Sequence, residues 1–136
     1  MQPKWFKDEI CEELEGACTY WKCAIDAMKT HPEWWAKCFA KMAEQEQDHA
    51  THLYKMFMDM YTDIEEPDGY MKSLMEGVME CFSTNMRKIE DHKTTYEMMW
   101  KKEEREESET KEEEEMMEEE EEDDPYMSSP ILAGLK

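Results

Sequence analysis

Two stretches of this sequence place apolar residues alternately four and three positions apart, a spacing that keeps one side of an α-helix facing a core. The first stretch, from about Lys4 to Lys29, carries the stripe Ile10, Leu14, Ala17, Trp21, Ala24 and Met28. The second, ending near Tyr61, carries Trp35, Phe39, Met42, Leu53, Met56 and Met60. A third apolar face begins near Tyr70 and comprises Met71, Leu74, Met75, Val78, Phe82, Met86, Ile89, Tyr96 and Met99. These faces predict an all-α fold.

The connections between the stretches predict how the helices are arranged. Residues 30–33, Thr-His-Pro-Glu, have the spacing of a capping box with proline in the first turn, so the second helix starts at once. So short a connection favours an antiparallel hairpin. Residues 63–69 form a turn before a long third helix. The apolar stripes are narrow, so we expect oligomerisation to complete a larger helical bundle.

Two polar residues, Glu46 and His49, interrupt the stripe of the second helix as Glu-x-x-His. A spacing of three puts both side chains on one helix face. A carboxylate and an imidazole on a core-facing stripe are costly unless they are paired or bind something. This pair is therefore the main functional clue in the sequence.

Glu13 on the first helix lies at the same height in the hairpin as this pair. It precedes Thr30 by 17 residues, whereas Glu46 and His49 follow Thr30 by 16 and 19. At about 1.5 Å per residue, all three lie roughly 25 Å from the turn. Tyr20 follows Glu13 by two helical turns on the same side. Carboxylate oxygens with one imidazole suit iron or manganese, whereas structural zinc favours thiolate-rich ligand sets.

Glu13, Tyr20 and the Glu46-x-x-His49 motif resemble the first half of the ferritin-like superfamily, over about residues 5–61. That superfamily includes bacterioferritins, rubrerythrins and encapsulated ferritin-like proteins. The resemblance implies Glu13 as a terminal metal ligand, Glu46 as a bridging ligand and His49 as the nitrogen ligand. It implies Tyr20 as a cofactor-binding residue behind them. The implied cofactor is a di-iron pair, with manganese as the alternative, and the implied activity is that of a ferroxidase.

The third helix lacks the second half of such a site. At the matching height its inward residues are Val78, Cys81, Phe82 and Asn85, and none is a carboxylate. One chain therefore supplies at most half of a di-iron site. Encapsulated ferritin-like proteins resemble this case, because they build the site across a symmetric dimer. We accordingly expect a homodimer or a higher homo-oligomer.

Charge divides the chain into three segments. Residues 1–102 are the helical domain, 103–124 an acidic low-complexity segment and 125–136 a C-terminal peptide. The acidic segment holds 16 acidic residues against Arg105 and Lys111, which gives −14 of the chain's net −20. We expect its helix to fray after residue 102, because stacked like charges oppose it. Such charge disfavours nucleic acid and membrane partners.

The C-terminal peptide is similar in kind to the cargo peptides of encapsulated ferritin-like proteins. Its apolar residues Ile131, Leu132 and Leu135 follow the acidic spacer and could dock on a shell or particle protein. A disordered terminus is the other interpretation. Loss of co-purification with such a shell after deletion of residues 125–136 tests the docking.

The five cysteines, Cys11, Cys18, Cys23, Cys38 and Cys81, are odd in number and contain no Cys-x-x-Cys pair. This pattern predicts reduced thiols and a cytoplasmic location, or one inside a protein shell or virion. The N-terminal residues lack the uninterrupted apolar run of a signal peptide, and no stretch approaches the roughly 20 apolar residues of a membrane span.

Two functions are open at this point. The first is a ferritin-like protein with an iron pair at a subunit interface. The alternative is a metal-free helical assembly protein, associated with a phage or a compartment and docked through its C-terminal peptide. In that case Glu46 and His49 pair with each other or with other side chains, or reach solvent.

Overall fold

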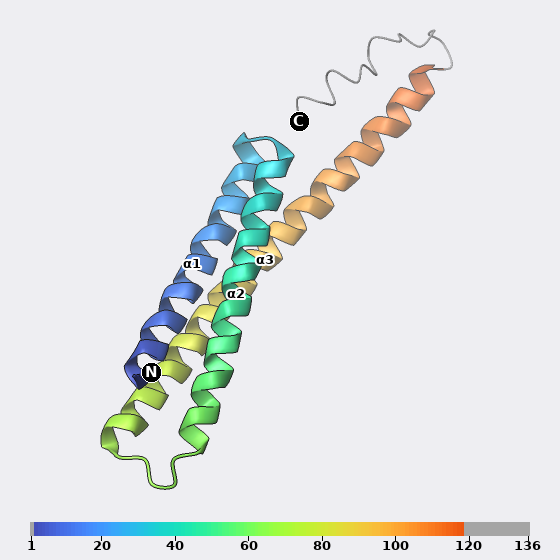
Figure 1. Ribbon diagram of the computed structural model, residues 1–136. Helices are drawn as coiled ribbons and strands as arrows, with labels where there is room; N and C mark the ends of the chain where they lie inside the picture. The colour runs from blue at the N-terminus through green and yellow to red at the C-terminus, as the bar shows by residue number, and fades with distance from the viewer. Residues whose placement is uncertain (1, 119–136) are drawn as a thin grey trace.

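A computed structural model describes residues 2–118, with side chains described to Glu115. It contains the helices α1 (Pro3–Thr30), α2 (Glu33–Thr62) and α3 (Gly69–Glu118), and no strand within the described range. Helices α1 and α2 form an antiparallel hairpin, and α3 returns alongside them and extends beyond the α1–α2 turn (Figure 1). The predicted all-α fold, with a hairpin and a long third helix, is confirmed.

The helix starts differ in how they are capped. Asp68 precedes α3 and its Oδ1 accepts a hydrogen bond from the backbone N–H of Met71 at 2.8 Å, a typical N-cap. Before α2 the predicted capping box is wrong. The Thr30 hydroxyl instead donates to the carbonyl of Asp26, one turn back in α1, and Pro32 occupies the N-cap of α2. The tight connection therefore depends on Pro32 and on the end of α1 rather than on a side-chain cap.

Helix α1 is the central element, because it packs on both α2 and α3 whereas α2 and α3 contact each other at few positions. Its buried residues include five of the six predicted stripe residues: Ile10, Leu14, Ala17, Trp21 and Ala24. Met28 is only half-buried, and Ala27 is buried in its place. One α2–α3 contact is a stack of Tyr54 on Phe82, with ring centroids 4.2 Å apart. Substitutions on the buried face of α1 would thus weaken its packing on both α2 and α3.

The predicted stripe of α2 is wrong by one residue. The buried residues are Ala36, Ala40, Ala43, Ala50 and Phe57. One residue corresponds to a rotation of about 100° around the helix axis. The sequence pattern follows large apolar side chains, but the alanines are what allow α1 and α2 to approach closely. Gln47 lies between Ala43 and Ala50, and its Oε1 accepts a hydrogen bond from Trp21 Nε1 at 2.9 Å.

The large residues of α2 consequently lie on a second, partly open face. Trp35 is 37% exposed, Met42 39% and Met56 57%, and Trp34 beside them is 52% exposed. Phe39, Leu53 and Met60 are half-buried at its edge. We call the face formed by Trp35, Phe39, Met42, Leu53, Met56 and Met60 the outer α2 face. Exposed apolar patches of this kind mark interaction surfaces.

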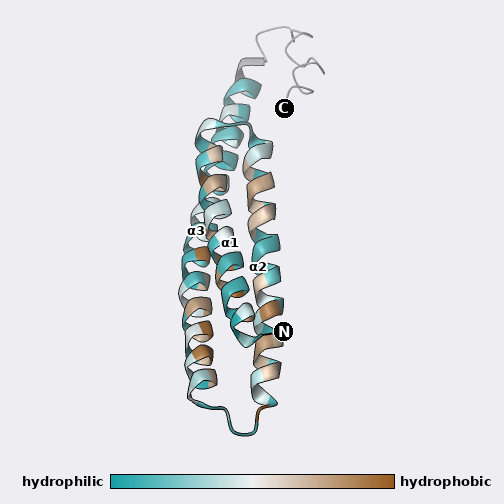
Figure 2. Cartoon of the chain, turned by 60° about the vertical axis from the view of Figure 1, so that its left-hand side comes forward, coloured by the Kyte–Doolittle hydropathy of each residue, from teal (hydrophilic) through white to brown (hydrophobic). Residues whose placement is uncertain are grey.

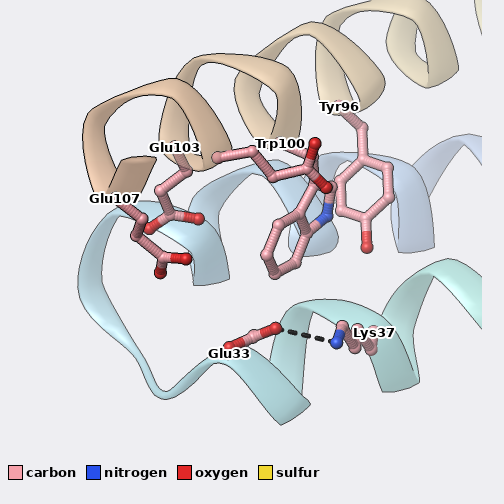
Figure 3. A pocket seen from close by; sticks show the side chains of 7 residues that line it. Glu33, Lys37, Tyr96, Trp100, Glu103 and Glu107 are labelled. Carbon is pink, nitrogen blue, oxygen red and sulfur yellow. Dashed lines mark ion pairs between the residues drawn. The ribbon is translucent and has the colours of Figure 1, made fainter. Parts of the chain in front are cut away.

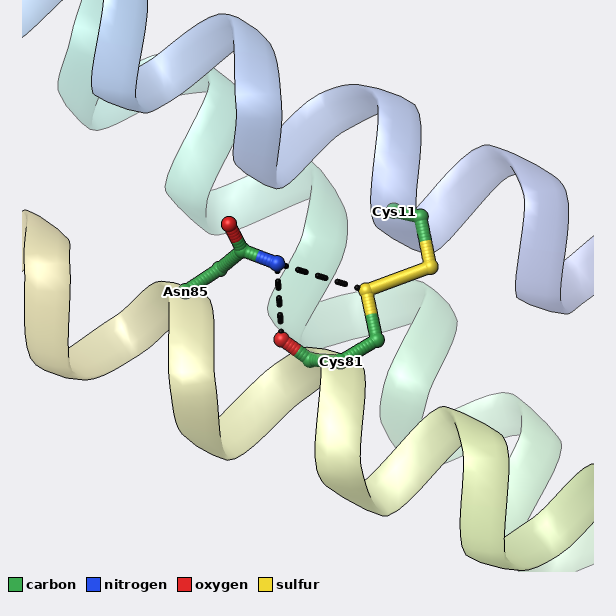
Figure 4. The surroundings of a disulfide bond; sticks show 3 residues. All are labelled: Cys11, Cys81 and Asn85. Carbon is green, nitrogen blue, oxygen red and sulfur yellow. Dashed lines mark hydrogen bonds between the residues drawn. A yellow bond between two sulfur atoms is a disulfide. The ribbon is translucent and has the colours of Figure 1, made fainter.

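A disulfide joins Cys11 of α1 to Cys81 of α3, with Cα atoms 6.1 Å apart, a usual separation for a disulfide (Figure 4). The Asn85 amide donates to the Cys81 carbonyl at 2.9 Å beside it. The expectation that all five cysteines are reduced is wrong for this pair. The sequence pattern did not indicate this pairing. The two cysteines are 70 residues apart and meet only when α3 packs on α1. Cys18, Cys23 and Cys38 are free thiols.

The prediction that α3 frays after residue 102 is wrong, because the helix continues to Glu118. Its side chains from Lys101 to Glu115 are exposed, and this part of α3 is hydrophilic in Figure 2. The strong helix propensity of glutamate and the absence of glycine or proline outweigh the like-charge repulsion. Glu107 and Lys111 also have the four-residue spacing, with the acidic residue first, that favours a helix.

The start of this extension is attached to the hairpin beside the α1–α2 turn (Figure 3). Lys37 Nζ lies over the Trp100 ring, 5.2 Å from its centroid, and 2.7 Å from Glu33 Oε1. Together with Tyr96 and acidic residues of α3 these groups surround a hollow of about 350 Å³. Lys37 of α2 thus contacts Trp100 of α3, which joins the start of the extension to the hairpin.

Within residues 2–118 no helix is both long and apolar enough to cross a membrane. The expected end of the acidic segment and the C-terminal peptide with Ile131, Leu132 and Leu135 lie outside the described residues.

Candidate metal centre

The structure brings Glu13 of α1 together with Glu46 and His49 of α2, as their heights in the hairpin predicted. His49 Nδ1 lies 3.6 Å from Glu13 Oε2. The His49 side chain is 63% exposed, whereas that of Glu13 is only 22% exposed. The imidazole therefore faces outward at the rim, and the Glu13 carboxylate lies below it between the helices.

Glu46 has a raised pKa of about 7. The main cause is the neighbouring Glu13 carboxyl group, which favours the protonated form of Glu46. Desolvation and the charge of Glu13 raise the pKa further, while the charge of His49 lowers it. With this raised pKa, the two neighbouring carboxyl groups favour one proton between them near neutral pH, and a divalent cation could take the place of that proton.

The raised pKa of Glu46 predicts that stability falls as pH increases from about 4.5 to about 7. The folded state binds a proton in this window that the unfolded state has released, so the contribution is present below it and lost above it. We expect a loss of about 1 kcal/mol, because solvent screens a half-exposed group. Urea unfolding at pH 5 and pH 8 should show this loss in the native chain and a smaller one in Glu46→Gln. Equal losses in both would contradict the shared proton.

Glu13 Oε2 is buried and accepts no hydrogen bond. A buried carboxylate oxygen without a donor is costly, and this one belongs to a side chain that interacts with the Glu46 carboxyl group and lies 3.6 Å from His49 Nδ1. Either a proton or a cation would satisfy it. Two carboxylates and an imidazole are the donor types that iron and manganese take, so the residues present fit such an ion in chemistry.

The fit is incomplete within the part of the chain that the structure describes. Among the described residues, no group of three or more His, Cys, Asp or Glu side chains converges as a ready metal site. Helix α3 adds no carboxylate here, because Cys81 is in the disulfide and Phe82 stacks on Tyr54. Donors from outside residues 2–118 would be needed to complete the coordination of an ion held by Glu13 and Glu46.

Tyr20 does not lie in the carboxylate group itself. Its half-buried ring stacks on Phe39 of α2, with centroids 6.4 Å apart and an interplanar angle of 24°. It thus joins α1 to the outer α2 face two turns from Glu13. Its implied role behind the ligands stays a prediction.

Sequence reasoning missed Gly16, which faces Glu46 across the α1–α2 contact. An added Cβ at Gly16 would lie 3.2 Å from Glu46 Oε2. The available signal was a glycine in the interior of a helix, three residues after Glu13 and therefore on its face.

Residues 8–128 match the rubrerythrin family. The chain belongs to the rubrerythrin family. Comparisons with curated proteins and with solved structures found no match. Rubrerythrins are a family of the ferritin-like superfamily, so the ferritin-like assignment is confirmed. Members of the family typically bind a di-iron pair.

The rubrerythrin match also extends further than the motif suggested. The resemblance rested on residues 5–61, but the match includes the whole described part of α3. Helix α3 is therefore part of the family domain even though it supplies no visible ligand.

Proposed function

We propose that this rubrerythrin-family chain binds a carboxylate-bridged iron pair at an interface between two copies of itself and oxidises iron there. Manganese is the alternative ion. The observation that carries the proposal is the buried, unpartnered Glu13 Oε2 beside the Glu46 carboxyl group, with His49 exposed above them.

The outer α2 face supports the second copy as the source of the missing donors. Its apolar residues lie on the same side of α2 as Glu46 and His49 and are left partly exposed by the single chain. In a twofold dimer the same patch meets itself, so each residue is supplied twice. Two copies of Glu13, Glu46 and His49 give the four carboxylates and two imidazoles found in bundle-core di-iron sites.

In the proposed site Glu13 would be a terminal ligand, Glu46 a bridging ligand and His49 the nitrogen ligand. Bound iron would supply Fe(II) oxidation by dioxygen or peroxide. Glu46 must lose its proton to bridge, so we expect iron affinity to rise with pH through about 7.

The metal-free alternative is supported by the same carboxyl pair, because a proton held between Glu13 and Glu46 offsets much of the cost of their proximity without an ion. The chain would then be a helical assembly protein. The partner expected through the C-terminal peptide would be its main ligand.

Anaerobic titration of Fe(II) by calorimetry, with the mass in solution measured before and after, separates the two functions. We expect about one iron per chain in a dimer, as in two half-sites that face each other. Admission of oxygen should then produce ferric absorbance. The absence of binding heat at pH 7.5 for either Fe(II) or Mn(II) would overturn the proposal and favour the assembly role.

A further inference from the structure

Gly16 is an unexpected residue at its position in α1. It lies in the interior of a 28-residue helix with helical backbone and no positive φ. A glycine there costs about 1 kcal/mol relative to alanine, because it loses more conformational freedom on folding. No turn requires glycine at this point, so the reason must lie in what occupies the space beside it.

That space is occupied by the side chain of Glu46. An added Cβ at Gly16 would lie 3.2 Å from Oε2, 3.6 Å from Cδ and 3.9 Å from Cγ of Glu46. The first distance is tighter than ordinary packing, so either the carboxyl group or the helix would have to move. The Glu46 side chain therefore lies across α1 at Gly16 and reaches Glu13 one turn away.

We propose that Gly16 is a positioning residue that sets where the Glu46 carboxyl group lies relative to Glu13. A methyl group at this position would displace the carboxyl oxygen by a few tenths of an ångström. Such displacements weaken preorganised ligand sets, since supporting residues typically change metal affinity about 10- to 100-fold. The consequence for iron rests on the proposed function, whereas the placement of the carboxyl group does not.

The chain provides a matched control at Gly77, which is also inside a helix. An added Cβ there would meet only the end of the Lys7 side chain, with Nζ at 3.0 Å and Cε at 3.2 Å. A flexible lysine can move aside. Gly16→Ala and Gly77→Ala therefore make the same chemical change, but only the first presses on a carboxyl group.

Carbon-13 spectra of the glutamate carboxyl groups test the placement without metal. We expect Gly16→Ala to shift the Glu46 and Glu13 resonances and Gly77→Ala to leave them unchanged. In the Glu46→Ala background, Gly16→Ala should raise the midpoint of thermal unfolding by a few degrees, because helix propensity then acts alone. In the native background this gain should be absent. Unchanged resonances, or the same gain in both backgrounds, would overturn the positioning role.

Iron titration adds the second measurement. We expect about 10-fold weaker affinity in Gly16→Ala and native affinity in Gly77→Ala. In a Glu46→Asp background, whose shorter side chain leaves room for the methyl group, Gly16→Ala should have no further effect. If the native chain binds no iron, the proposed function fails while the spectra still decide the role of Gly16. Native iron affinity in Gly16→Ala would overturn the positioning role alone.

Discussion

Loss of iron binding is the expected result when Glu46 and His49 are both replaced by alanine. The change removes the proposed bridging carboxylate and the imidazole that lies 3.6 Å from Glu13, so we expect affinity to fall by at least about 100-fold. The fold should survive, because His49 is exposed and Glu46 is only partly buried. Calorimetric titration of Fe(II) measures the loss, and circular dichroism verifies the helix content.

Helix α2 also carries a second glutamate and a second histidine that serve as a control. Glu44 and His52 are exposed on the same helix, and His52 Nδ1 lies 2.7 Å from the carbonyl of Asp48 rather than near Glu13. The Glu44→Ala, His52→Ala variant should bind iron as the native chain does. Native affinity in the Glu46→Ala, His49→Ala variant would place any iron elsewhere and end the proposal for this site.

Breaking the Cys11–Cys81 disulfide is expected to lower the free energy of unfolding by about 4 kcal/mol. The bond closes a loop across 70 residues of sequence, and constraining an unfolded chain over such a distance gives a stabilisation of this order. It also joins α1 to α3, which are not consecutive along the chain. Urea unfolding of Cys11→Ser, compared with the native chain with and without a thiol reductant, measures the effect.

Cys38→Ser is the control for this comparison, because Cys38 is an exposed free thiol and its loss should change stability by less than about 0.5 kcal/mol. If Cys11→Ser and the reduced native chain unfold at the same urea concentration as the oxidised chain, the two cysteines are not paired in solution. The sequence-based expectation of reduced thiols would then hold.

Much of the fold could be predicted because helices leave a periodic record in the sequence. The stripe of α1 from Ile10 to Ala24 is buried nearly as predicted, and each helix begins within about two residues of the expected position. The face of α2 could not be assigned in the same way. Four of its five buried residues are Ala36, Ala40, Ala43 and Ala50, and alanine is too weakly hydrophobic to stand out beside tryptophan and methionine.

The candidate site was predictable to the extent that it depends on height along a hairpin. Counting from Thr30 placed Glu13 opposite Glu46 and His49, and the structure brings Glu13 within 3.6 Å of His49. Features that depend on packing between distant segments were not predictable. Cys11 meets Cys81 only through the α1–α3 contact, and Gly16 matters only because the Glu46 side chain lies over it.

The alanine contact between α1 and α2 has a consequence for how this sequence can change over time. Side-chain volume at positions 36, 40, 43 and 50 sets the separation of the two helices, and that separation fixes how far Glu13 is from Glu46 and His49. A larger residue at any of these four positions would move α1 and α2 apart. The distance between the proposed ligands would then increase although no ligand had been substituted. These four alanines therefore set the spacing of the site. We expect them to be substituted more slowly in evolution than the larger, exposed residues beside them.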